Sequence, residues 1–115
     1  MYATWERFHG AALVLAGAGP VKLRLADAYR SHLADLDVEE LPRELRAEFL
    51  AIATSLTSGR AMGGLGVIDA TVRKLSDAQA AASAVRLVEM FAQLAQSQPA
   101  TQRTPALRAI GSSQP

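Results

Sequence analysis

Two runs of helical periodicity, joined by a short acidic connection, occupy residues 21–56 and constrain the fold more than any other feature of the sequence. In the second run, apolar residues recur at spacings of four, three and four, which places them on one helix face: Leu45, Phe49, Ile52 and Leu56. The first run has a matching face, made of Val21, Leu25, Ala28, Tyr29, His32 and Leu36. Because each face needs an apolar partner, the two runs predict a central αα-hairpin.

The connection between the two runs contains residues that end one helix and begin another. Asp37 can cap a new turn through its carboxylate, and Glu40 stands three residues later, at the position of a capping box. Pro42 suits the first turn of a helix, where its missing N–H leaves no hydrogen bond unmade. These residues predict a tight polar turn between antiparallel helices.

A further helix is expected before the hairpin. Thr4 is its predicted N-cap, and its apolar face comprises Trp5, Phe8, Ala12, Leu15 and Ala16. It should end at residues 17–20, where glycine permits a C-cap and proline can open the next helix.

The second half of the chain predicts a glycine-rich loop and two more helices. The loop runs from Gly59 to Gly66, with four glycines in eight residues. Residues 67–75 are expected to form a short helix, and Ser76 and Gln79 match a capping box that opens a last helix running to about Gln96. The candidates for burial on that last helix are Ala81, Ala84, Val85, Val88, Phe91, Leu94 and Ala95.

Together these elements predict an all-α fold, a compact bundle of four to five helices with the central αα-hairpin. The helical bundle domain spans residues 1–96, and residues 97–115, rich in Pro, Ser, Gln and Thr, are expected to be a disordered C-terminal tail. The predicted core consists of Trp5, Phe8, Leu15, Leu25, Tyr29, Leu33, Leu36, Leu45, Phe49, Ile52, Leu56, Val85, Val88 and Phe91.

The totals exclude several kinds of site. No cysteine occurs among the 115 residues, which excludes disulfides, thiolate zinc sites and a cysteine nucleophile. The formal charge is +1, and removing the tail with Arg103 and Arg108 leaves ten Lys and Arg against eleven Asp and Glu. This balance disfavours binding to nucleic acid or to an anionic membrane. No apolar run approaches the roughly 18 residues of a membrane span.

The two histidines carry the candidate metal and acid–base chemistry. Glu6 and His9 form one E-x-x-H pair, the kind that carboxylate-bridged di-iron bundles carry on two helices. His32 lacks the second such pair, because Tyr29 stands three residues before it. A half-buried ring that closes the hairpin is the favoured interpretation of His32, and the alternative is an acid–base pair with Asp35, Asp27 or Glu39.

Nucleotide and DNA motifs are weak or absent. Gly66 is followed by Val67 and Ile68, so the loop lacks the Lys and Ser or Thr of a phosphate-binding loop. A helix-turn-helix would use residues 42–57 for recognition, but that helix mixes acidic with basic residues and attracts phosphates little. Residues 67–75 are a second, short and weakly basic candidate.

The sequence therefore predicts a small non-enzymatic protein, a regulatory or accessory module that acts through contacts with another protein and self-associates as a homo-oligomer. Surplus apolar residues lie off or at the edges of the main stripes and favour an interface: Leu13, Val14, Leu23, Leu33 and Leu50. No catalytic, cofactor-binding or metal-ligating residue and no cofactor is expected, and a cytoplasmic location fits the absence of cysteine. The alternatives are a DNA-associated helix-turn-helix-like regulator and a metal- or histidine-dependent enzyme.

Two segments, AYRSHLADLDVEELPRELRAEF and TVRKLSDAQA, resemble a group of small uncharacterised helical proteins of proteobacteria. The resemblance covers most of residues 5–92. It implies a bacterial origin, attaches no activity and carries over no functional residue.

Overall fold

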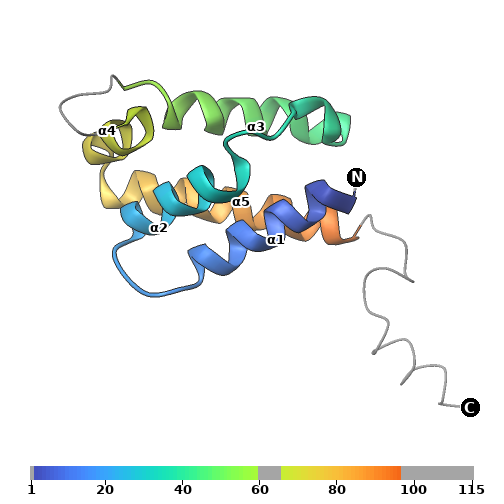
Figure 1. Ribbon diagram of the computed structural model, residues 1–115, viewed down its shortest axis with the longest axis horizontal. Coiled ribbons are helices and arrows are strands. Elements are labelled where there is room, and N and C mark those ends of the chain that lie inside the picture. The colour runs from blue at the N-terminus through green and yellow to red at the C-terminus, as the bar shows by residue number, and fades with distance from the viewer. Residues whose placement is uncertain (1, 60–65, 97–115) are drawn as a thin grey trace, which may run out of the picture.

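The protein is an all-α bundle, as the sequence predicts. The computed structural model describes residues 2–59 and 66–96, and within these ranges it has five α-helices and no strand (Figure 1). The helices are α1 (Tyr2–Leu15), α2 (Val21–Ala28), α3 (Arg43–Leu56), α4 (Val67–Lys74) and α5 (Asp77–Gln96). The predicted tail, residues 97–115, and most of the predicted glycine loop lie outside the described residues.

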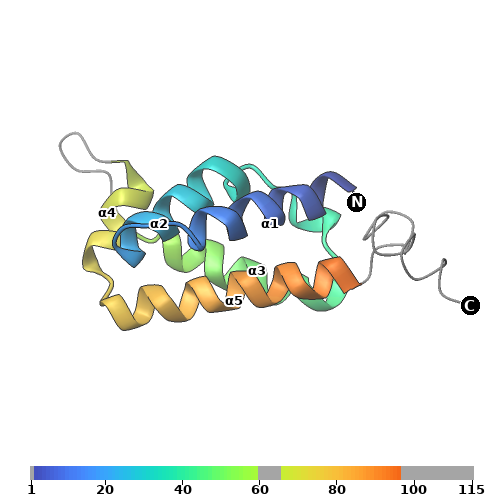
Figure 2. The same cartoon turned by 90° about the horizontal axis from the view of Figure 1, so that it is seen from below.

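The helices pack as a group of three covered by a pair. Helices α1, α2 and α5 contact one another, and α3 and α4 lie together on the other side (Figure 1). Helix α1 runs opposite in direction to α5 along one face of the molecule (Figure 2). The two groups meet in the core, where the ring of Phe8 meets that of Phe49 edge to face with centroids 5.8 Å apart. Helices α2 and α3, which the sequence joins in a hairpin, therefore belong to different groups, and each contributes its apolar face to the shared core.

Most of the predicted core is confirmed. The buried apolar residues include Phe8, Leu15, Leu25, Tyr29, Leu33, Leu45, Phe49, Ile52 and Leu56. Trp5, Leu36 and Phe91 are partly buried and pack against this cluster. Leu33, which the sequence also counts among the surplus apolar residues, is fully buried.

The boundary signals are confirmed at several positions. The hydroxyl of Ser76 accepts a hydrogen bond from the Gln79 N–H (3.0 Å), and the Gln79 side chain accepts one from the Ser76 N–H (2.9 Å). This is the predicted capping box, and α5 begins and ends where expected. The Asp37 carboxylate caps a short 3₁₀ turn, Val38–Glu40, by accepting from the Glu39 N–H (3.0 Å).

The prediction of Thr4 as an N-cap is wrong. Helix α1 begins at Tyr2, so Thr4 lies inside its first turn and is buried. Its hydroxyl donates to the Glu40 carboxylate at 3.3 Å. The N-cap of α3 is Pro42, without a side-chain cap, so Glu40 ties the hairpin turn to α1 and does not close a capping box. A local cap can be predicted from neighbouring residues, whereas the contact between Thr4 and Glu40 exists only in the folded bundle.

The prediction of Val85 and Val88 as core residues is also wrong. Their exposed fractions are 55% and 41%, and the buried residues of α5 are Ala80, Leu87, Met90 and Leu94. Both sets have helical spacing, so periodicity cannot choose between them. The core takes the set with the larger Leu and Met side chains, which removes more apolar surface from water.

A π-helical segment, Tyr29–Leu33, extends α2. It brings His32 against α1, where Gly10 makes room for the ring. A Cβ added at Gly10 would lie 2.6 Å from His32 Nδ1, so any other residue at this position would force the ring to shift away from α1. The predicted half-buried position of His32 is confirmed.

Candidate functional site

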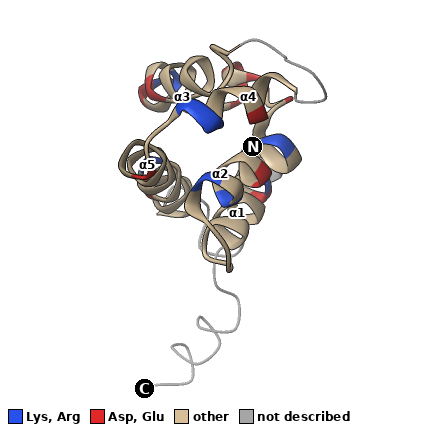
Figure 3. Cartoon of the chain, turned by 90° about the vertical axis from the view of Figure 1, so that its left-hand side faces the viewer, with Lys and Arg blue, Asp and Glu red and all other residues tan. Residues whose placement is uncertain are grey.

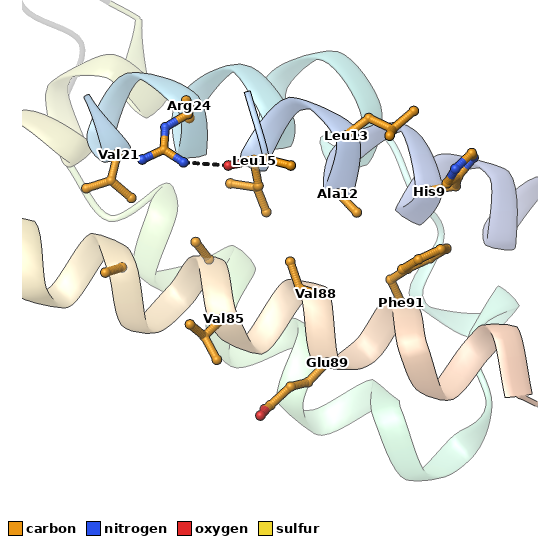
Figure 4. A pocket seen from close by; sticks show the side chains of 13 residues that line it. His9, Ala12, Leu13, Leu15, Val21, Arg24, Val85, Val88, Glu89 and Phe91 are labelled. Atoms are coloured by element: carbon orange, nitrogen blue, oxygen red, sulfur yellow. Dashed lines mark hydrogen bonds between the residues drawn. The ribbon is translucent and has the colours of Figure 1, made fainter. Parts of the chain in front are cut away.

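The most developed candidate site is an apolar groove between α1 and α5 (Figure 4). Its volume is about 700 Å³, and one end is flanked by the first turns of α2. The lining comes from all three helices: His9, Ala12, Leu13, Leu15 and Ala16 from α1 and its end, Val21 and Arg24 from α2, and Ala81, Ala84, Val85, Val88, Glu89 and Phe91 from α5.

Small side chains leave the space between the two helices. Ala12 and Ala84 are half-buried there, and Ala16 and Ala81 are exposed. Larger apolar side chains stand on both sides of the groove, with Leu13 on α1 exposed at 62% and Val85 on α5 at 55%. The groove therefore presents apolar surface that no described residue covers.

Aromatic rings form the end of the groove farthest from α2. The His9 ring stacks on Trp5 and on Phe91, with centroid distances of 5.3 Å and 5.5 Å, and the Trp5 and Phe91 rings lie 6.0 Å apart. Three rings in mutual contact give this end a large apolar surface, which suits packing against apolar groups. The E-x-x-H residue His9 is therefore held by stacking, and its predicted partner Glu6 lines a different pocket.

Two charged residues stand beside the groove. The Arg24 guanidinium donates to the carbonyl oxygens of Leu15 and Gly19, the latter at 2.8 Å, and so caps the C-terminal end of α1. Glu89 lies on the α5 side (Figure 4). Within residues 2–59 and 66–96, neither Arg24 nor Glu89 forms an ion pair. Neither charge is therefore neutralised by an ion pair within these residues, although the Arg24 guanidinium is held in place by the carbonyls at the end of α1.

A second, polar pocket of about 440 Å³ contains His32. Its lining is Glu6, Arg7, Ser31, His32 and Asp35. The Arg7 guanidinium donates to the His32 carbonyl oxygen (3.3 Å) and pairs with the Asp35 carboxylate. The hydrogen bond from Arg7 to the Asp35 carboxylate and the positive charge of Arg7 hold the pKa of Asp35 below its ordinary value. Asp35 is thus engaged by arginine rather than by the histidine proposed as its acid–base partner.

Of the other partners considered for His32, Asp27 is engaged elsewhere, since it pairs with Arg30 at 2.9 Å. Glu39 is exposed in the 3₁₀ turn, where its backbone oxygen accepts from Arg46 at 3.1 Å. Among the residues that the structure describes, no group of three or more His, Asp and Glu could hold a metal ion. The histidine pairs that the sequence raised are therefore not brought together with further ligands in this part of the chain.

Three charged residues of the two candidate recognition helices make contacts within the protein, namely Arg46, Glu48 and Asp69. Arg46 donates to backbone carbonyls, and Glu48 on α3 pairs with Arg86 on α5. Asp69 on α4 pairs with Arg30 at 2.9 Å. Basic and acidic residues both occur on the helices visible in Figure 3.

The sequence contains a partial signal for the groove. Of the predicted surplus apolar residues, Leu13, Leu23 and Leu50 are exposed, and Leu13 lines the groove. The sequence places Val85 and Val88 in the core, but α5 also carries a second apolar stripe with Leu87 and Met90. Only one of the two stripes can face the core, and the stripe with Val85 and Val88 is exposed. The unusually wide apolar face of α5, which holds two stripes, is the sequence feature that could have indicated the groove.

No described helix is both long enough and apolar enough to cross a membrane. In comparisons with protein families, curated proteins and solved structures, no match to this chain was found.

Proposed function

We propose that this protein is a non-enzymatic interaction module that binds protein through the α1–α5 groove and self-associates. The observation that carries the proposal is the exposure of Leu13, Val85 and Val88 around one continuous apolar groove. Scattered apolar residues are ordinary on protein surfaces, but a contiguous apolar surface with polar groups at its edges is typical of a binding site.

The chemistry of the groove favours a helix as the bound element. Two antiparallel helices with small residues between them offer the space that a third helix needs for close packing. The aromatic end at Trp5, His9 and Phe91 supplies a large apolar contact. The charges of Arg24 and Glu89 beside the groove would fix the direction of a bound helix that carries opposite charges. A cytoplasmic location is part of the proposal, since a chain without cysteine suits a reducing compartment.

Sedimentation equilibrium over a wide concentration range tests self-association. We expect the wild-type chain to associate and Val88→Asp to weaken association at least tenfold, because a buried unpaired carboxylate opposes contact. Leu50→Asp is the matched control, since Leu50 is 50% exposed on α3, outside the groove.

Affinity capture from the native cell tests binding to other proteins. Proteins bound through the groove should be retained by the wild-type chain and by Leu50→Asp, and lost with Val88→Asp. If the wild-type chain is strictly monomeric and no retained protein depends on Val88, the proposal is wrong. Salt-sensitive retardation of duplex DNA would favour the DNA-associated alternative instead.

A further inference from the structure

The occupant of the groove can be inferred from the groove's own charges and shape. Resting on the proposed function, we infer that the α1–α5 groove binds a second copy of this chain, in a twofold dimer where Arg24 of each copy faces Glu89 of the other. The carrying observations are one positive and one negative side chain beside the same apolar groove, neither of which forms an ion pair with any residue that the structure describes.

Charge complementarity in a twofold dimer requires both signs on one face. Arg24 lies on the α2 side of the groove and Glu89 on the α5 side, at different points along its length (Figure 4). A twofold axis lying in the contact plane between these two positions exchanges them. It brings Arg24 opposite the partner's Glu89 and, by symmetry, Glu89 opposite the partner's Arg24. One surface thereby forms two ion pairs with a copy of itself.

The shape of the groove is also suited to a copy of itself. The same face contains a recess above Ala12 and Ala84 and projecting side chains at Leu13 and Val85. In an isologous contact, the projecting side chains of each copy are available to fill the recess of the other. The dimer would shield the most exposed large apolar residues of α1 and α5 from water, which gives the association its driving force.

Complementary charge reversal tests this arrangement. Sedimentation equilibrium compares the wild-type chain, Glu89→Arg, Arg24→Glu and an equimolar mixture of the two variants. Each variant alone places two like-charged pairs in its homodimer, so we expect its dissociation constant to rise about tenfold. In the mixture both pairs are again opposite in charge, so the heterodimer should recover approximately the wild-type affinity.

Two further variants keep the test decisive if Arg24→Glu loses its fold together with the cap on α1. Glu89→Arg should weaken the dimer more than Glu89→Gln, since reversal adds repulsion whereas neutralisation only removes attraction. Glu44→Arg, the same change at an exposed position on α3, should leave the affinity unchanged.

The contrary outcomes separate this inference from the proposed function. A wild-type dimer that responds equally to Glu89→Arg and Glu44→Arg would overturn the inference and leave self-association standing. A monomeric chain that captures another protein in a Val88-dependent way would overturn the inference and leave the interaction module standing. A monomer with no such capture would overturn both.

Discussion

Gly10 is the residue whose role is least evident from the sequence. Glycine weakens a helix interior by about 1 kcal/mol relative to alanine, so its place in α1 looks unfavourable. The structure supplies the reason, because the His32 ring packs directly against Gly10. A Cβ at position 10 would lie 2.6 Å from His32 Nδ1 and 2.7 Å from Cε1. A local preference is overridden here by a contact between segments 22 residues apart in the chain.

We therefore expect Gly10→Ala to destabilise the protein by about 1–2 kcal/mol, since the clash with His32 outweighs the gain in helix propensity. In the His32→Ala background the same change should stabilise by up to about 1 kcal/mol, because the space is free. Urea denaturation of the four proteins in this double-mutant cycle measures both effects. An equal effect of Gly10→Ala in the two backgrounds would contradict the contact.

Phe49 gives the largest expected effect of a single truncation on α3. Its side chain is buried and meets Phe8 edge to face. Phe49→Ala should lower the free energy of unfolding by about 3–5 kcal/mol through lost burial and a residual cavity. Chemical denaturation measures the change, and a loss below about 1 kcal/mol would be incompatible with a core position.

At the scale of elements, the ends of α5 followed from the sequence, whereas the face that it buries did not. The Ser76–Gln79 capping box and the end of α5 depend on residues close together in the chain, and both were predicted. The face that α5 buries depends on which helices surround it, and two stripes of equal spacing gave no basis for choosing. The groove was missed for the same reason, because Val85 and Val88 line it only if Leu87 and Met90 face the core.

Alanine substitution on α5 tests which stripe faces inward. Leu87 has an exposed fraction of 1%, so Leu87→Ala should lower the free energy of unfolding by about 2–5 kcal/mol. Val85→Ala, two residues away on the same helix, should change stability by less than about 0.5 kcal/mol at concentrations where the chain is monomeric. Thermal or urea unfolding compares the two variants. A larger loss of stability for Val85→Ala than for Leu87→Ala would mean that the stripe with Val85 faces the core.

At the scale of the whole molecule, charged side chains join elements that are distant in the sequence. The Lys22 ammonium on α2 donates to the Arg73 and Leu75 carbonyl oxygens, at 3.2 Å and 3.0 Å, and so complements the C-terminal end of α4. Arg73 and Lys74 lie in the last turn of α4 and add positive charge there, but the contribution of Lys22 depends on the folded bundle and cannot be assigned from local sequence. The ion pair between Arg7 and Asp35 likewise links α1 to the turn after the π-helical segment.

The pair between Arg7 and Asp35 predicts a pH dependence of stability. Since the pKa of Asp35 is lowered in the folded protein, its contribution is complete above the ordinary pKa of aspartate. That contribution is lost as the pH falls through the lower, folded-state value. Asp35→Asn should therefore lose less stability than the wild type on acidification, with the difference small because the carboxylate is exposed. Urea titrations at neutral and acid pH measure the difference, and equal losses would exclude the contribution.

Association through the α1–α5 groove would couple the stability of the whole molecule to its concentration. A second copy that binds only the folded chain stabilises it, by about 2.7 kcal/mol for a one-site ligand at a hundred times its dissociation constant. Because about 1 kcal/mol shifts the Tm of a domain near this size by roughly 4–8 °C, the wild-type Tm should rise by several degrees across a hundredfold increase in concentration. Val88→Asp should unfold at one Tm throughout, since its groove no longer accepts an apolar surface, whereas Leu50→Asp should retain the wild-type dependence. A concentration-independent wild-type Tm over a range where sedimentation detects dimers up to the unfolding temperature would mean that the unfolded chain associates as tightly as the folded one, and a contact specific to the folded groove could not then hold the dimer.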